Sequence, residues 1–145
     1  MKPREEIRKR FDVDLKSLAL LEDYLRESVE ICRQMKADQL SRKDLREIGA
    51  LTDRFQRAQD FFVSRILRSI DELAGDEGTT EDVLNRSEKR GLIGSASDFL
   101  DMRVLRNKIA HEYAGYGPMD IVNDILEFTP MLLLAFQQTR EYNIL

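Results

Sequence analysis

The chain has 145 residues, of which 42% are hydrophobic and 34% charged, and its formal net charge is −4. This length predicts one domain, residues 1–145, able to bury about two-thirds of its unfolded surface. The acidic balance excludes a broad electrostatic grip on nucleic acid, which needs many Lys and Arg contacts to phosphate, and leaves only a local basic patch possible.

The single cysteine and two stretches of the sequence, 1–6 and 131–136, bear on the cellular compartment of the protein. Cys32 has no second cysteine to pair with, so an intramolecular disulfide and a multi-cysteine metal site are excluded. Its apolar surroundings predict a buried thiol in a reduced compartment. Residues 1–6 are charged and lack the apolar core of a signal peptide, and the longest apolar run, 131–136, is too short for a bilayer. We expect a soluble, cytoplasmic protein.

The first half of the chain predicts helices. Residues 1 to about 13 are charged and irregular, and we expect a short helix or a loose arm there. Asp14 can cap a helix that ends near residues 35–38. Its apolar residues fall at steps of three and four: Leu18, Leu21, Leu25, Val29 and Cys32. Ser41, followed by Asp44, predicts the capped start of a further helical stretch, which continues as one helix or two in line to about residue 73.

The second half predicts three more helices. Thr79 or Thr80 caps a short one. Ser95 or Ser97 caps the next, from about 98 to 113, and the Gly-rich break at 115–118 ends it. The last runs from about 119 to 142, and Pro130 can kink it. The sum is five helices without a convincing strand, which predicts an all-α fold: an up-down four-helix bundle with an additional short helix.

Residues 106–113 (Arg-Asn-Lys-Ile-Ala-His-Glu-Tyr) contain the only histidine of the chain. At 100° per residue, one side of this helix carries the apolar residues that should face the core, namely Met102, Leu105 and Ile109. A second apolar side is formed by Leu100 and Val104, and Asn107 and His111 continue it. A helix that is apolar on two sides is usually buried on two sides, so the second side predicts a subunit contact.

Arg106 and His111 are about 140° apart around the helix, too far to converge on one small group within a single chain. Across a two-fold axis, the Arg of one copy and the His of the other could share a cleft. Such a pair suits phosphodiester chemistry, because Arg binds phosphate oxygens and His transfers protons near neutral pH. Asn107 could orient His111 or the substrate. RNA supplies its own 2′-hydroxyl nucleophile, so no metal or other cofactor is required.

Other basic residues could follow an RNA backbone: Arg86, Lys89, Arg90, Arg103 and Lys108. The alternative is structural. An Arg and a His at this spacing are common on helices, the basic residues could be a solvated face, and Tyr113 and Tyr116 could be ordinary amphipathic residues at a helix end.

The motif in its context resembles the HEPN superfamily, specifically the HepT-like proteins with an Arg-x4-His-x-Tyr motif. The match rests on residues 100–113, with a polar residue directly after Arg106 and with Tyr113 two residues after His111. The resemblance implies a homodimeric helical bundle acting as a metal-independent ribonuclease toxin, with Arg106 and His111 as the catalytic pair and Asn107 as their companion.

The resemblance also implies partners. These are an RNA substrate and an MNT-type nucleotidyltransferase antitoxin that transfers AMP from ATP to Tyr113. Lys108, Arg103, Arg90 and Lys89 would then be RNA-contact candidates. The alternative is a non-catalytic HEPN helical dimer that binds a nucleotidyltransferase without cutting RNA, and a third possibility is a helical scaffold with no RNA role.

Overall fold

The computed structural model describes residues 3–111 and 115–142, and for residues 110 and 111 it describes the helical backbone only. In this part of the chain all regular structure is helical, which confirms the all-α class. The elements are α1 (Arg4–Arg33), α2 (Arg42–Phe61), the π-helical segment η1 (Phe62–Leu67), α3 (Arg68–Leu73), α4 (Thr80–Lys89), α5 (Ala96–His111) and α6 (Pro118–Arg140).

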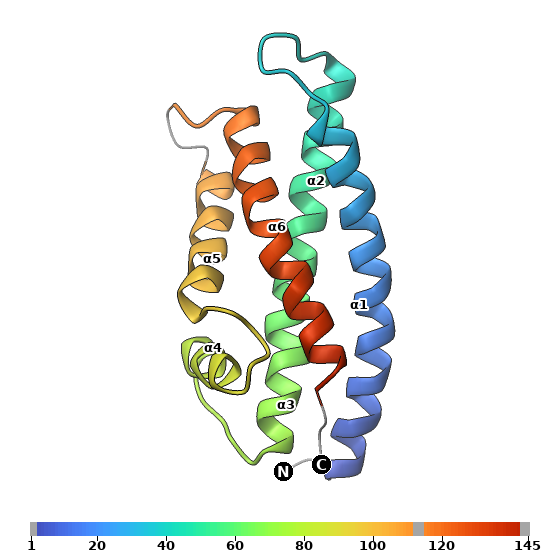
Figure 1. The fold of residues 1–145 in the computed structure, drawn as a ribbon, viewed down its shortest axis with the longest axis vertical. Helices are drawn as coiled ribbons and strands as arrows, with labels where there is room; N and C mark the ends of the chain where they lie inside the picture. Colours follow the sequence, from blue (N-terminus) through green and yellow to red (C-terminus); the bar gives the residue numbers. More distant parts are fainter. Residues whose placement is uncertain (1–2, 112–114, 143–145) are drawn as a thin grey trace.

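The four long helical stretches run up and down the length of the molecule (Figure 1). α1 rises, the in-line stretch α2–η1–α3 descends, α5 rises and α6 descends, while the short α4 lies across the lower end of α5. One hydrophobic core takes residues from all of them, with Phe62 at its centre. The Phe62 ring lies 6.0 Å from that of Phe99 in α5 and 4.9 Å from that of Phe136 in α6.

Capping residues set the starts of α2 and α4. The Ser41 hydroxyl accepts a bond from the Asp44 backbone N–H at 3.0 Å, and the Asp44 carboxylate accepts one from the Ser41 N–H at 3.0 Å. Thr79 and Asp82 form the same reciprocal arrangement at α4. These two capping boxes satisfy backbone donors that the first helical turn leaves unpaired. They confirm the predicted cap at Ser41. Of the two threonines predicted as alternatives at the start of α4, Thr79 is the cap.

The stretch from residue 42 to residue 73 is continuous, as one of the two predicted arrangements required. Its middle, η1, is wound more loosely than an α-helix, and a π-helical turn of this kind shifts the helix face by about one residue. Phe62, Val63, Ile66 and Leu67 are all buried there. At 100° per residue, Ile48, Phe55 and Ile70 lie within about 40° of one line, so the stretch keeps one apolar side on the core along its length.

The prediction for the N-terminal segment was wrong. Residues 4–13 form the first turns of α1 rather than an arm or a separate short helix, because Ile7 and Phe11, four residues apart, are buried against the bundle. Asp14 does not cap a helix. It lies inside α1, is 4% exposed, and accepts a bond from Arg65 of η1 at 3.1 Å. A carboxylate that pairs with a distant arginine was misread as a local cap.

The last helix begins at Pro118, one residue earlier than predicted, and continues through Pro130 without interruption.

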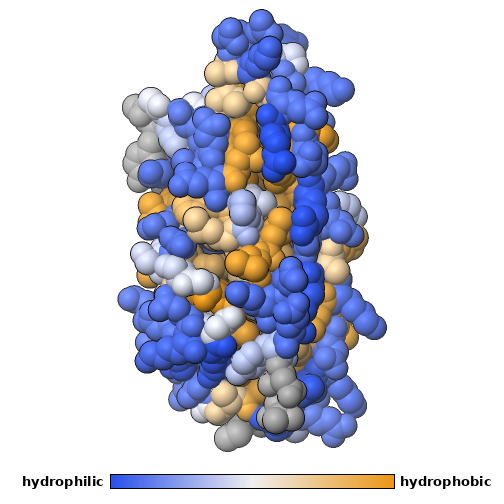
Figure 2. All heavy atoms as spheres, in the orientation of Figure 1, coloured by the Kyte–Doolittle hydropathy of each residue, from blue (hydrophilic) through white to orange (hydrophobic). Residues whose placement is uncertain are grey.

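Figure 2 shows apolar side chains along the middle of the visible face, between the α6 and α1 ribbons of Figure 1, and hydrophilic side chains over most of the rest. Among the described helices, none has the length and apolar character that a membrane crossing requires.

Candidate functional site

Two contacts fix the start of α5, the helix that carries residues 106–111. The Ser95 hydroxyl accepts a bond from the Asp98 N–H at 3.2 Å, which identifies Ser95 rather than Ser97 as the cap. The Glu88 carboxylate from α4 accepts a bond from the Ala96 N–H at 2.7 Å. Both oxygens satisfy orphan donors of the first turn, so α4 and α5 are joined at this end.

The core-facing side of α5 is as predicted. Met102 and Leu105 are 1% and 3% exposed, and Ile109 packs against the core with part of its surface accessible. The second apolar side is open. Val104 is 51% exposed, while Leu100 is half-buried against the core. The predicted subunit contact on this side is therefore an accessible surface in the single chain.

Arg106 lies on the side of α5 that faces the end of α2. Its Nη1 atom is 3.4 Å from Oδ1 of Asp60, and the two side chains are 49% and 59% exposed. An ion pair this exposed contributes about 0–1 kcal/mol, so a better-matched anion can replace the carboxylate. The guanidinium is thus oriented and still available to an incoming phosphate.

Asn107 is exposed beside Arg106, and the α5 backbone is helical as far as His111. The 140° separation predicted for Arg106 and His111 therefore holds for the helix that carries them. Within one chain, Arg106 lies on the side of α5 that faces Asp60. Position 111 lies on a different side of the helix, the side of Asn107 and Val104. Tyr113, the predicted modification site, lies outside the described residues.

Beside this second side, a cleft of about 250 Å³ separates α5 from α6. Three acidic residues, one lysine and three apolar residues line it: Asp101, Asp124, Glu127, Lys108, Val104, Leu105 and Phe128. The Lys108 ammonium lies 5.7 Å from the centre of the Tyr116 ring, a cation–π arrangement. Lys108 is therefore partly engaged, although its side chain is exposed.

Tyr116 anchors the turn between α5 and α6. Its hydroxyl donates a short hydrogen bond to the Asp124 carboxylate. Burial, the bond to Asp124 and the charges of Asp124 and Asp120 all raise the pKa of the Tyr116 phenol far above its ordinary value. The Tyr116 hydroxyl therefore stays protonated and bonded to Asp124, and it fastens the turn to α6.

The predicted RNA-contact residues do not form one patch. Arg103 and Lys108 are exposed on α5, but Lys89 and Arg90 follow Glu88 at the opposite end of that helix. Ten residues separate Ala96 from Arg106, or about 15 Å along the axis. Arg90 also pairs with the Asp71 carboxylate and, at 2.8 Å, with Asp76. Its guanidinium is occupied, so the structure argues against Arg90 as a phosphate contact.

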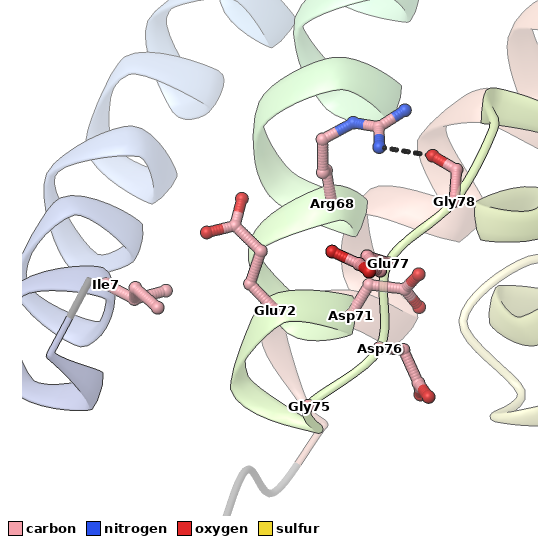
Figure 3. Close-up of a pocket in the computed structure, with 8 residues that line it drawn as sticks. All are labelled: Ile7, Arg68, Asp71, Glu72, Gly75, Asp76, Glu77 and Gly78. Atoms are coloured by element: carbon pink, nitrogen blue, oxygen red, sulfur yellow. Dashed lines mark hydrogen bonds between the residues drawn. The ribbon is translucent and has the colours of Figure 1, made fainter. Parts of the chain in front are cut away.

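A cavity of about 640 Å³ lies around the loop between α3 and α4, at the far end of the molecule from the last turns of α5 (Figure 3). Half of its lining residues are acidic, and the full set is Ile7, Arg68, Asp71, Glu72, Gly75, Asp76, Glu77 and Gly78. Asp71 is 1% exposed and bound by Arg86 and Arg90, so the polar groups around this hollow hold the α3–α4 loop in place. Arg86, another predicted phosphate contact, is engaged here as well.

Two residues of the site were not found from the sequence. Asp60 is 46 positions from Arg106, and Asp124 of α6 lines the same cleft as Lys108 of α5. No local spacing relates these pairs, since each joins residues of two different helices. In the described residues, no cluster of His, Cys, Asp and Glu has a composition suited to a metal ion.

The fold and the site together define an all-helical bundle with an accessible Arg-Asn pair in the last turns of α5. No protein-family model matches the chain, and no curated protein is similar enough in sequence to count as a match.

Proposed function

We propose that the chain is a HEPN-type, HepT-like ribonuclease toxin, active as a homodimer with the two α5 motifs at a shared cleft. The observation that carries this proposal is the placement of Arg106: an exposed guanidinium, preoriented by a single weak carboxylate contact, five residues before the only histidine of the chain. The open Val104 side of α5 supports the dimer, because a two-fold contact there would cover an exposed apolar side chain.

The chemistry would be internal transesterification of RNA. The 2′-hydroxyl oxygen attacks the adjacent phosphorus, the bond from phosphorus to the 5′-oxygen breaks, and the products are a 2′,3′-cyclic phosphate and a free 5′-hydroxyl. Arg106 would stabilise the negative charge on the phosphate oxygens. His111 would move the proton that the 2′-hydroxyl loses or the one that the leaving 5′-oxygen gains. Asn107 would orient His111 or the substrate, and Arg103 and Lys108 would contact the RNA backbone.

A second candidate function is a non-catalytic helical module that binds a nucleotidyltransferase. The acidic cleft favours it, because Asp101, Asp124 and Glu127 around Lys108 repel an RNA backbone and suit a basic protein surface. In either case the proposed partner is an MNT-type nucleotidyltransferase, and Tyr113 is the proposed acceptor of AMP.

Growth after induction separates the two functions. For the ribonuclease, Arg106→Ala and His111→Ala abolish growth inhibition and RNA cleavage, while the dimer stays folded. Arg33→Ala, which removes an arginine of α1 that is 61% exposed and has no role in the proposed site, is the matched control and should retain the cleavage. Cleavage at the wild-type rate by both Arg106→Ala and His111→Ala would refute the catalytic assignment. A wild-type protein that binds a nucleotidyltransferase without cutting RNA would establish the second function instead.

A further inference from the structure

Helix α1 carries an exposed apolar stripe made of Val13, Leu20, Tyr24 and Ile31. Their exposed fractions are 61%, 53%, 44% and 39%. At 100° per residue the four lie within about 20° of one line, and that line is about 27 Å long. The opposite side of α1 holds Glu22, whose carboxylate pairs with Arg140 of α6 at 2.7 Å, so the stripe faces away from the bundle. Four exposed apolar side chains aligned on one face of a helix, with polar residues in the gaps between them, suit an amphipathic contact surface.

The spacing of the stripe is symmetric about position 22. Val13 and Ile31 lie nine residues before and after it, and Leu20 and Tyr24 lie two before and after it. An antiparallel copy of α1, related by a two-fold axis at this level, would therefore set Val13 against Ile31 and Leu20 against Tyr24. Each apolar residue would meet another, as an isologous contact requires.

Charges beside the stripe follow the same symmetry to within one residue. Lys16 and Glu27 are exposed, lie within about 20° of each other on one flank, and stand six residues before and five after position 22. Neither forms a salt bridge with another described residue. The two-fold axis would bring Lys16 of each copy beside Glu27 of the other, and opposite charges flanking an apolar seam select orientation in paired helices.

Tyr24 is held ready for such a contact. The Arg54 guanidinium of α2 lies 5.3 Å from the centre of its ring and donates to the Ser28 hydroxyl at 2.8 Å. Beside the ring is a hollow of about 250 Å³ between α1 and α2, which is lined by Leu21, Tyr24, Asp53, Arg54 and Arg57 and has room for a side chain from outside. A fixed aromatic next to a small hollow is typical of the anchor positions of protein interfaces.

We propose that the α1 stripe is an interface with a second copy of this chain, paired antiparallel about position 22. It is separate from the α5 contact of the proposed ribonuclease dimer, and neither contact requires the other. A chain that used both would assemble beyond a dimer.

The test measures mass by sedimentation or light scattering over about 5–200 µM, a range that suits an interface of modest area. Leu20→Glu should lower the mass to half that of the wild-type species, or to less than half if the α5 face also associates. Leu134→Glu is the matched control, because Leu134 of α6 is 54% exposed, and it should leave the mass unchanged. Equal masses for wild type and Leu20→Glu at the highest concentration overturn the proposal, including the case where a different protein covers the stripe. Helical circular dichroism verifies that each variant is folded.

A charge swap tests the antiparallel pairing. Lys16→Glu and Glu27→Lys, each alone, place like charges together twice and should raise the dissociation constant about tenfold. The double variant restores both pairs and should return the constant to within about twofold of wild type. Single variants that associate normally, or a double variant that stays weak, overturn the pairing. The readout is association alone, so a failure here leaves the ribonuclease proposal untouched.

Discussion

Asp60 Oδ1 lies 3.4 Å from Nη1 of Arg106, and this contact ties the end of α2 to the motif helix. Both side chains are about half-exposed, so water screens the pair, and its contribution is at most about 1 kcal/mol. A phosphate can accept two parallel bonds from a guanidinium and carries more charge. In the proposed ribonuclease, Asp60 would therefore compete with RNA for Arg106, and only weakly.

The first prediction is that Asp60→Asn tightens RNA binding. Removing the competing charge should lower the dissociation constant for a labelled single-stranded RNA by up to about fivefold, measured by fluorescence anisotropy at low salt. Asp53→Asn is the control, because Asp53 is 60% exposed on the same helix and pairs with Arg57 at 2.9 Å. It makes the same change in net charge away from the motif. Weaker binding by Asp60→Asn would mean that Asp60 positions Arg106 instead of competing for it.

The second prediction concerns the acceptor of AMP. With an MNT-type nucleotidyltransferase and ATP, mass spectrometry of peptides should locate the added AMP on Tyr113, and Tyr113→Phe should eliminate it. Tyr116→Phe should leave it in place, because burial and the hydrogen bond to Asp124 raise the pKa of the Tyr116 phenol and hold its oxygen. AMP found on Tyr116, or lost in Tyr116→Phe alone, would contradict the assignment.

The third prediction is that Cys32 is inert in the folded chain. Its side chain is 1% exposed and its sulfur contacts the Glu47 carbonyl oxygen at 3.6 Å. Burial, and then the charges of Glu47 and Asp44, raise the pKa of the thiol to about 11. At pH 8 only about one thiol in a thousand is ionised. A thiol reagent should label the native protein slowly and the urea-unfolded protein completely within minutes. Rapid labelling of the native protein would show that α1 opens near Cys32.

Features set by short-range chemistry could be predicted from the sequence. The cap at Ser41 depends on Asp44 three residues away, and the core side of α5 depends on a single helix period. The start of α1 was missed because its buried residues, Ile7 and Phe11, are outnumbered by charged neighbours. A charged segment can still be helical when one apolar side packs on a bundle.

Contacts between distant segments could not be predicted in this way. Asp is a residue type that often caps helices, so the sequence predicts a cap at Asp14. Only its pairing with Arg65, 51 residues away, shows that it is a buried ion-pair partner. Asp60 could not be predicted as a residue of the candidate site, because nothing near it in sequence relates it to Arg106. The helix period predicts on which side of a helix a residue lies. It does not predict which residue of another helix faces it. The charge opposite Arg106 is known only from the folded structure, in which the side chain of Asp60 reaches it from α2.

The last prediction is a dependence of stability on acid, centred on Asp71. This carboxylate is 1% exposed and is bound by Arg86, through Nε at 2.9 Å, and by Arg90. Burial alone would raise its pKa, but the hydrogen bonds and positive charges of the two arginines outweigh burial and lower the pKa below the ordinary value of 3.8. A depressed folded-state pKa stabilises the fold above the unfolded pKa. That stability is lost as the pH falls from 3.8 through the folded value.

Asp71→Asn should therefore destabilise the protein at neutral pH by roughly 2–3 kcal/mol in urea unfolding, somewhat less than for a fully buried ion pair because the arginines are partly exposed. The difference from wild type should stay constant down to about pH 5 and shrink below about pH 4 as Asp71 of the wild type becomes protonated. Asp76→Asn is the control. Asp76 also pairs with Arg90 but its side chain is 41% exposed, so its loss should cost less than about 1 kcal/mol. A difference between wild type and Asp71→Asn that persists unchanged below pH 3 would mean that shape, and not charge, makes Asp71 important to the α3–α4 junction.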